Sequence, residues 1–383
     1  MSEACDLVVV GGGFAGLAAA RAAALRGMAV LVAEAKPALG VRLHTTGIFV
    51  REAADAYDIP TMLSRRVSRV RLYGPSRKAF ELDAPGYYFL TTDTAAVLRW
   101  MGAEAERAGA QIRVGCRFEG AAREGDGWRV RLGGESVQAR YLLGADGARS
   151  AVAAALALPR NRRFLTGVER EYADPGALDP SALHVFLDSR TAPGYIAWAA
   201  VNPQGAQVGL AVSRRRKPRI DDFAREAESL FGLDPQGASE RRAGLIPCGG
   251  VLKRWSVRGA MLIGDAAGMV SPLTGGGIHP ALALGRRSGQ AIADFLAGVG
   301  PAPELAVAKA VPNWGAKLVL RGLLDLAPPN WLLEMSLAAG PMSAFARRVF
   351  FARDRGATKS KAESPSVPPH AGAPQAVTPP TKP

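Results

Sequence analysis

Cysteine is scarce in this sequence of 383 residues, which contains Cys5, Cys116 and Cys248 but no CxxC pair. Zinc sites and disulfide frameworks need paired or clustered cysteines, so the sequence predicts neither. No window offers the roughly 18 uninterrupted apolar residues that a membrane-spanning helix needs. The polar residues 1–6 also lack the pattern of a secretory signal. These absences predict a cytoplasmic protein in a reducing compartment.

Acidic residues are few relative to basic ones, with 34 Asp and Glu against 48 Lys and Arg and a formal net charge of +14. Such a charge suits an acidic partner, either a nucleic acid or an anionic lipid surface. The arginines are scattered, however, and do not alternate with aromatic residues along one stripe, so we expect no nucleic-acid binding. The densest run, RRRKPR at 214–219, is interpreted as a solvated turn, with a docking patch as the alternative.

Glycines gather near the start of the chain, in the stretch VVVGGGFAGLAAARAAALRG at 8–27. The apolar residues 7–10 predict a buried parallel strand, and the alanine-rich segment after the glycines predicts a helix. Gly11 then permits the tight turn, Gly13 lets backbone approach a pyrophosphate, and Gly16 lets the helix pack on the strand. Amides at the helix start would point at the phosphate. The stretch therefore predicts a βαβ dinucleotide-binding unit.

Glu34 ends a second apolar run, about 20 residues beyond the glycines. A carboxylate at this place accepts hydrogen bonds from a ribose hydroxyl and would repel a 2′-phosphate, which favours NAD or FAD over NADP. A second strand, loop and helix at 260–296 favours FAD, because nicotinamide-binding proteins need no such element. Within it, Asp265 can bind a polyol chain, and the glycines at 275–277 can bring bare backbone to the pyrimidine edge of a flavin.

Asp146 lies in a third motif, GADGARS at 144–150, which follows a predicted strand at 141–145. Ligands of open α/β sheets bind at the carboxyl ends of strands, so Asp146 is a candidate cofactor residue. The alternative is a turn closed by its side chain. The presence of the other two motifs favours the cofactor interpretation.

Three motifs of this sequence resemble those of FAD-dependent oxidoreductases with the p-hydroxybenzoate hydroxylase fold. Within that class they resemble the motifs of the geranylgeranyl reductases. The motifs are GGGFAG (11–16), GADGARS (144–150) and GDAAGMVSPLTGGGI (264–278). Hydroxylases usually carry His after GDAA, whereas Gly268 stands here, as in the reductases. The resemblance implies an α/β fold with a discontinuous Rossmann-type FAD-binding domain, an antiparallel-sheet substrate domain and a C-terminal helical region. It also implies FAD as the cofactor, reduced by NAD(P)H or a ferredoxin. The residues assigned to FAD are Gly11, Gly13, Ala15, Gly16, Glu34, Asp146, Gly264, Asp265, Pro272, Gly275, Gly276, Gly277 and Ile278.

Short alternating runs between the motifs, such as ALHVFL at 182–187 and GAQVGLAV at 205–212, predict antiparallel strands that roof the flavin. The tail is rich in Pro, Ser and Ala and is expected to be disordered. The expected domains are an FAD-binding domain over 1–65, 93–157 and 248–298, a substrate domain over 66–92 and 158–247, a helical region over 299–356 and a disordered tail over 357–383.

Two histidines and a tryptophan are the candidate catalytic residues, and no metal site is expected. His44 lies in the loop where geranylgeranyl reductases typically carry Cys, and His279 lies just after the triple glycine. Either is a candidate proton donor, with a hydrogen-bonded structural role as the alternative. Trp198 lies in a segment that resembles the Tyr/Trp wall of the reductase cavity. Because a regular strand would put Tyr195 and Trp198 on opposite faces, Trp198 is preferred as the wall residue, with core packing as the alternative.

Residues 314–351 predict short amphipathic helices broken at prolines, with Trp, Phe and Leu along one side. They predict either a helical cap over the substrate cavity or a rim that contacts a membrane and admits a lipid tail. The cations expected near the edges of this rim are Lys317, Arg321, Arg347 and Arg348.

These features together predict an FAD-dependent oxidoreductase that reduces double bonds of an apolar isoprenoid or lipid-linked substrate. One alternative is an FAD-dependent monooxygenase that hydroxylates an aromatic or polyketide substrate. A further alternative is a membrane-docked flavin-binding protein without catalysis. The expected location is the cytoplasm, with peripheral contact at the inner membrane face if the rim hypothesis holds.

Overall fold

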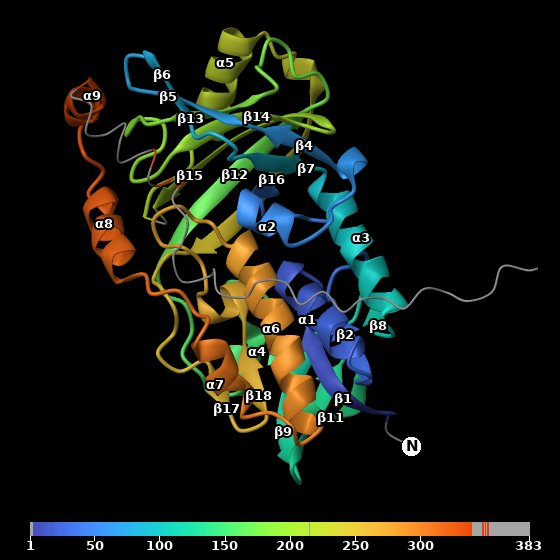
Figure 1. Ribbon diagram of the computed structural model, residues 1–383. Coiled ribbons are helices and arrows are strands. Elements are labelled where there is room, and N and C mark those ends of the chain that lie inside the picture. Colours follow the sequence, from blue (N-terminus) through green and yellow to red (C-terminus); the bar gives the residue numbers. More distant parts are fainter. Residues whose placement is uncertain (1–2, 214, 339–346, 348, 350, 352–383) are drawn as a thin grey trace, which may run out of the picture.

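The computed structural model describes residues 3–213, 215–338, 347, 349 and 351 (Figure 1). The tail at 357–383, which we expect to be disordered, and Arg348 lie outside these described residues. Two large sheets form the described part of the chain, and helices cover the faces and one edge of this pair.

The first sheet is built around β1 (Glu3–Val10), whose apolar residues at 7–10 are buried. Strands that are buried on both faces read as continuous apolar runs, which explains the unbroken LVVV sequence here. The strand order is β17-β18-β11-β1-β2-β8, with β10 and β9 added to β11 as an antiparallel pair. These strands are β2 (Val30–Ala33), β8 (Gln111–Arg113), β9 (Phe118–Glu124), β10 (Gly127–Leu132), β11 (Glu135–Gly144), β17 (Ser256–Val257) and β18 (Ala260–Leu262).

The register of this sheet brings the carboxyl ends of four parallel strands to one edge. Val10 lies opposite Ala33 on β2 and Gly144 on β11, and Gly144 lies opposite Leu262 on β18. Segments that follow these strands therefore meet at that edge, where ligands of open α/β sheets bind. The predicted α/β class is confirmed. The segments that meet are the first glycine loop, Glu34, Asp146 and Asp265.

Helices α1 (Phe14–Ala24) and α6 (Ile278–Leu296) lie side by side against this sheet (Figure 1). Gly285 and Gly289 of α6 face α1, and a Cβ on either glycine would overlap a backbone carbonyl oxygen of α1. Only glycine permits so close an approach, and it brings the starts of both helices near the same edge of the sheet. The other helices of this part are α2 (Arg51–Asp55), α3 (Thr94–Arg107), α4 (Ala151–Ala155) and the 3₁₀ turns η1 (Thr61–Leu63) and η3 (Gly264–Ala267).

The second sheet has the order β16-β12-β15-β14-β13-β5-β6 and is antiparallel except between β13 and β5. Both alternating runs singled out in the sequence form strands of it, at β13 and β15. Helix α5 (Ile220–Phe231) covers its outer face through Ile220, Phe223 and Ala227. The strands are β5 (Arg69–Tyr73), β6 (Ala79–Asp83), β12 (Phe164–Tyr172), β13 (Ala182–Phe186), β14 (Ala197–Asn202), β15 (Gly205–Ser213) and β16 (Ala238–Pro247), and the turn η2 covers Pro235–Gly237.

A small third sheet consists of β3 (Ile48–Val50), β7 (Phe89–Thr92) and β4 (Ser64–Val67). It is bonded to the second sheet, because the Thr91 hydroxyl donates a hydrogen bond of 2.6 Å to the Val201 carbonyl of β14. The chain thus passes from one large sheet to the other and back, as a discontinuous FAD-binding domain requires. The domain limits given above remain predictions.

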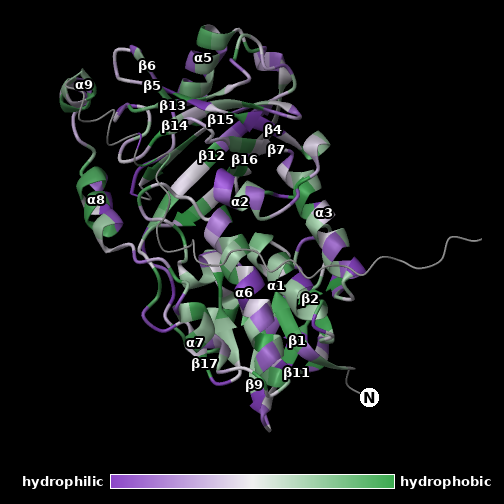
Figure 2. Ribbon diagram, in the orientation of Figure 1, coloured by the Kyte–Doolittle hydropathy of each residue, from purple (hydrophilic) through white to green (hydrophobic). Residues whose placement is uncertain are grey.

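The C-terminal part continues as α7 (Pro303–Ala308), α8 (Gly315–Asp325) and α9 (Asn330–Ala338). The break at the prolines between α8 and α9 is confirmed. In Figure 1 these two helices run along the outer edge of the second sheet, and in Figure 2 both carry hydrophobic turns at the periphery. Of the helices that the structure describes, none is long and apolar enough to cross a membrane.

Candidate active site

The first glycine loop leaves an open space at the start of α1. Gly11 has a φ of +107°, and a Cβ on Gly16 would overlap the Gly11 carbonyl oxygen, so the loop and the helix both require glycine. A Cβ on Gly13 would meet no atom of the described residues within 4 Å. The first amides of α1, which have no partner inside the helix, begin beside this space. A pyrophosphate bound here would receive hydrogen bonds from those amides, as the motif predicts.

Glu34 follows β2, and its carboxylate accepts hydrogen bonds from the backbone of two loops. Its Oε2 accepts a hydrogen bond of 2.7 Å from the Gly12 amide, and its Oε1 accepts one of 2.9 Å from the Lys36 amide. Each carboxylate oxygen can accept a second bond, so the group can still receive a ribose hydroxyl. The geometry fits the role that its position predicts.

Asp146 binds the first amides of α4 through one oxygen of its carboxylate and keeps the other oxygen unused. Its Oδ2 accepts hydrogen bonds of 2.7 Å from Ala151 and 3.0 Å from Val152, while the buried Oδ1 has no partner among the described residues. The side chain therefore closes a turn, as the alternative interpretation predicted. Burial raises the pKa of this carboxyl although the amides of α4 and Ser150 oppose the shift. The free oxygen leaves the cofactor role open as well.

Asp265 lies in η3, directly after β18, and burial raises the pKa of its carboxyl from 3.8 to about 6. Desolvation is the only cause of the shift, so no cation of the described chain compensates the charge. A desolvated carboxylate that has no partner among the described residues is a group that a bound hydroxyl donor would stabilise. This is the behaviour expected of a residue that binds the polyol chain of FAD.

The second glycine loop joins η3 to α6. Its turn is closed by a hydrogen bond of 2.9 Å from the Gly275 amide to the Ser271 carbonyl, and Gly277 precedes the first turn of α6. Pro272 is buried, whereas Gly276 is exposed. The other residues assigned to FAD contribute backbone and packing: Ala15 and Gly264 lie against each other, and Ile278 begins α6.

An apolar cluster of the second sheet roofs this loop. The Tyr195 hydroxyl donates a hydrogen bond to the Thr274 carbonyl, and a Cβ on Gly275 would lie 2.6 Å from that hydroxyl and 3.5 Å from Ile246 Cγ2. Tyr195 and Ile246 pack against a buried cluster. Burial raises the pKa values of the Tyr195 phenol and of the Cys248 thiol, so both groups are neutral. The cluster consists of Leu165, Trp198, Ala211 and Cys248.

Trp198 is 6% exposed and donates a hydrogen bond of 3.1 Å from Nε1 to Glu169 Oε2. The expectation that Tyr195 and Trp198 lie on opposite faces of a strand is wrong. Tyr195 precedes β14, which begins at Ala197, so strand alternation does not apply to it, and both rings pack in one cluster. Tyr195 is the ring that touches the glycine loop, while the role of Trp198 as a wall remains a prediction.

His44 and the second glycine loop approach the same face of β16. A Cβ on Gly244 would lie 2.7 Å from the His44 carbonyl, and Ile246, two positions further along the strand, contacts Gly275. Residues two apart on a strand share a face, so both loops meet there. His44 is exposed, and its Nδ1 lies 2.7 Å from the Ala243 carbonyl. His279 is partly buried in the first turn of α6.

The expectation that Arg321 lies near the edge of a surface rim is wrong, because its side chain is fully buried. It forms an ion pair of 2.9 Å with Asp325, donates a hydrogen bond to the Gly194 carbonyl, and lies 5.9 Å from the centre of the Tyr195 ring. Its Nη1 has no partner among the described residues. Arg163 also pairs with Asp325, at 2.8 Å. Arg321 thus joins α8 to the tyrosine that holds the glycine loop.

Sequence reasoning missed this contact, although the four-residue spacing of Arg321 and Asp325 is a recognisable signal for a helical ion pair. Of the other cations expected on the rim, Lys317 is half-buried and Arg347 is exposed and pairs with Asp83 at 3.3 Å. No group of three or more His, Cys, Asp or Glu within the described residues could hold a metal ion.

Comparison with known proteins links this site to flavoproteins. Residues 4–308 match the model of a family described as FAD binding domain. Digeranylgeranylglycerophospholipid reductase 2 of Methanopyrus kandleri is 31% identical over 312 residues, which is 76% of this chain and 77% of that protein. Digeranylgeranylglycerophospholipid reductase of Methanocaldococcus jannaschii is 27% identical over 301 residues, with coverage of 76% and 77%.

Solved structures share the fold. A geranylgeranyl bacteriochlorophyll reductase-like protein from Thermoplasma acidophilum has a TM-score of 0.78 at 22% identity, covering 92% of this chain and 98% of that one. The p-nitrophenol 4-monooxygenase of Pseudomonas putida has a TM-score of 0.69 at 15% identity, with coverage of 91% and 97%. At these identities the likeness concerns the fold, which reductases and monooxygenases have in common.

Proposed function

Since this chain belongs to the FAD-binding-domain family, and within it to the geranylgeranyl reductase group of FAD-dependent oxidoreductases, we propose that it reduces carbon–carbon double bonds of an isoprenoid lipid. The resemblance read from the three motifs is thereby confirmed. The proposal draws its substrate class from the relatives, which are named for digeranylgeranylglycerophospholipid. We further propose a cytoplasmic enzyme in peripheral contact with a membrane, where such a lipid resides.

The observation that carries the proposal is the apolar roof over the second glycine loop. Gly275 lies against Ile246 and the Tyr195 hydroxyl. Both of these side chains pack on the buried cluster that contains Trp198 and Cys248. The side chains of this roof are apolar or, in Tyr195 and Cys248, neutral, so they suit a hydrocarbon chain.

FAD, when bound, supplies the two electrons as a hydride equivalent, which the protein itself cannot carry. Gly13 and the first amides of α1 would hold the pyrophosphate, Glu34 the ribose, and Asp265 the polyol chain. The backbone of Gly276 and Gly277 and the start of α6 would lie against the flavin ring, where the positive end of the helix favours negative charge. We propose NAD(P)H or a ferredoxin as the source of the electrons.

Saturation of one double bond takes a hydride and a proton, so a proton donor is required. His44 is the stronger candidate, because it is exposed to solvent and its loop meets the same face of β16 as the second glycine loop. An imidazole can donate a proton and be protonated again from solvent after each turnover. His279, in the first turn of α6, is the second candidate.

Gly268 supports reduction over hydroxylation. It has a φ of +70°, and a Cβ there would overlap the Gly250 carbonyl oxygen and lie 2.8 Å from Asn161 Oδ1. The position therefore has no room for the histidine that hydroxylases usually carry after GDAA. The backbone in this chain is built around a glycine at that point.

Product analysis tests the proposal. Enzyme supplied with a chemical reductant and a geranylgeranyl diether lipid in the absence of oxygen should give products that have gained pairs of hydrogen atoms. The His44→Gln variant should be slower with the same FAD content, whereas His279→Gln, the matched variant, should retain the rate if His44 is the donor. A product that has instead gained an oxygen atom from O₂ would identify a monooxygenase.

A further inference from the structure

Helices α8 and α9 expose a strip of large apolar side chains. Of 13 large hydrophobic residues that are exposed in the described part of the chain, six fall between positions 319 and 335, so the exposure is concentrated here. On α8 they follow the spacing of one helix face, and on α9 they cover adjoining turns. Figure 2 shows the corresponding hydrophobic turns at the edge of the molecule. The strip consists of Val319, Leu323, Leu326, Trp331, Leu332 and Met335.

A cationic hollow of about 380 Å³ adjoins the strip. Among the described residues no acidic side chain lines it, and Ala327, which directly follows Leu326 of the strip, forms part of its wall. Arg190 and Arg219 each have an acidic neighbour, Asp188 and Asp222. The residues that line the hollow are Ser189, Arg190, Pro193, Arg216, Lys217, Arg219 and Ala327.

Arg216 and Lys217 provide the uncompensated charge of the hollow. Both are exposed, and within the described residues neither forms an ion pair. They belong to the run at 214–219 for which a docking patch was the alternative interpretation. Two free cations beside an exposed apolar strip are complementary to a surface that is anionic outside and apolar beneath.

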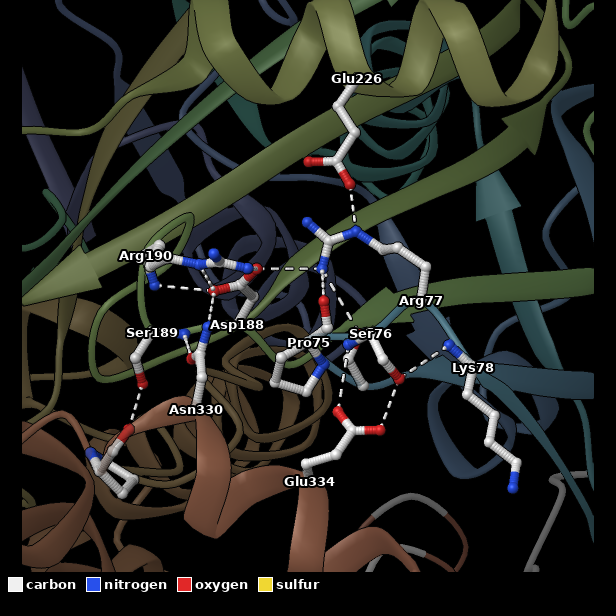
Figure 3. A network of polar contacts seen from close by, with 12 residues as sticks. Pro75, Ser76, Arg77, Lys78, Asp188, Ser189, Arg190, Glu226, Asn330 and Glu334 are labelled. Carbon is white, nitrogen blue, oxygen red and sulfur yellow. Dashed lines mark hydrogen bonds and ion pairs between the residues drawn. The ribbon is translucent and has the colours of Figure 1, made fainter.

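A network of hydrogen bonds fixes the strip beside the hollow (Figure 3). Asn330, at the start of α9, donates a bond of 2.7 Å to Asp188 and accepts one of 2.9 Å from the Ser189 amide. Glu334 of α9 accepts a bond of 2.5 Å from the Ser76 hydroxyl. Arg77 binds Asp188 at 3.0 Å. The polar network anchors one side of α9 to loops of the second sheet, and the exposed apolar residues lie on the same helix.

We propose that this strip and hollow form a docking surface for a bilayer that contains anionic phospholipids. The apolar side chains enter the interface between headgroups and acyl chains, and Arg216 and Lys217 bind the phosphates. That docking gives access to a lipid substrate rests on the proposed function. The docking surface itself is inferred from the exposed apolar side chains and the cations that are unpaired within the described residues. A second copy of the chain is the competing occupant of the strip.

Cosedimentation with vesicles tests the docking surface. The holoenzyme should sediment with vesicles of equimolar phosphatidylcholine and phosphatidylglycerol at low salt, less with phosphatidylcholine alone, and less as salt rises. Arg216→Gln with Lys217→Gln should weaken binding to the anionic vesicles about 30-fold, at roughly 1 kcal/mol per cation near the surface. Trp331→Ser with Met335→Ser should weaken binding to both kinds of vesicle.

The matched control is Arg99→Gln with Arg117→Gln, which removes the same charge from exposed positions. Arg99 lies on α3, on the opposite side of the molecule from α8 and α9 in Figure 1. The control should bind as the wild type does. Equal loss in both pairs would mean attraction by net charge and would overturn the docking surface, as would wild-type protein that stays in the supernatant.

A dimer in solution that dissociates with Trp331→Ser and Met335→Ser would also overturn the proposal, because a second copy would then cover the strip. All variants should retain the FAD content and circular dichroism of the wild type, which shows that they are folded. The assay involves no turnover, so failure to bind vesicles refutes docking and does not bear on the proposed reduction.

Discussion

Replacing Asp265 by Asn should stabilise the apoprotein while weakening its hold on FAD. The carboxyl of Asp265 has its pKa raised to about 6 by burial. At this group the folded state therefore binds more protons than the unfolded state between about pH 4 and 6, so the contribution of Asp265 to the free energy of unfolding falls as pH rises through this range. Above about pH 6 the desolvated charge of Asp265 lowers the free energy of unfolding, and a neutral amide of the same shape would avoid this loss.

The magnitude follows from the shift, since a difference from 3.8 to about 6 corresponds to about 3 kcal/mol. Asp265 keeps part of its surface exposed, and water there reduces the cost, so we expect a gain of about 2 kcal/mol for Asp265→Asn near pH 7.5. Near pH 4 the gain should vanish, because the carboxyl is then protonated in the folded state. The assay is urea unfolding of apoprotein at the two pH values, followed by tryptophan fluorescence.

FAD binding should change in the opposite direction. Loss of a hydrogen bond to a charged group costs about 1.5–3 kcal/mol, so the FAD dissociation constant should rise roughly 10- to 100-fold. Asp58→Asn, at an exposed position, is the control and should alter neither quantity. An Asp265→Asn apoprotein that is less stable than the wild type near pH 7.5, or that binds FAD as tightly, would refute the reasoning.

Three further perturbations separate the fold from the site. Gly13→Val should keep the unfolding midpoint of the apoprotein, because a side chain there enters open space, but should abolish FAD uptake. A Gly13→Val protein that is purified with yellow FAD would contradict the assignment. Gly16→Val should fail to fold, because its side chain would overlap the Gly11 carbonyl oxygen. His184 is buried with its pKa lowered to about 4, so as pH drops from 6.5 to 4 the unfolding free energy of the wild type should fall by about 3 kcal/mol relative to that of His184→Phe; a difference between the two proteins in urea unfolding that does not change with pH would disprove it. Arg321→Met should cost about 3 kcal/mol in urea unfolding and weaken FAD binding by freeing Tyr195, so unaltered FAD affinity would leave Arg321 with a structural role only.

The cofactor edge could be predicted from sequence because its signals are local. A β-branched run, three glycines and an alanine-rich helix fix the first βαβ unit, and parallel pairing then aligns the residues that follow each strand. Glu34 and Asp265 occupy the expected places for this reason. Asp146 also lies at this edge, although its hydrogen bond to the first amides of α4 is one that only the folded turn reveals.

The substrate side could not be predicted in the same way, because its contacts join segments far apart in the chain. An amphipathic pattern marks α8 as a surface helix but does not tell which side faces inward, and Arg321 is buried because Asp325 and the Gly194 carbonyl neutralise and bind it. Tyr195 reaches the glycine loop because it precedes the strand. The meeting of His44 with β16 joins positions about 200 apart, as the bond to Ala243 shows.

The most direct test is whether an isoprenoid lipid alone reoxidises the reduced flavin. Enzyme reduced chemically and kept free of oxygen should regain its oxidised flavin absorbance when a geranylgeranyl lipid is added, while a fully saturated lipid of the same length should have no effect. The reoxidation should match the amount of double bonds saturated, at one per flavin. If the flavin stays reduced until oxygen is admitted, and oxygen then enters the product, the chain is not a double-bond reductase.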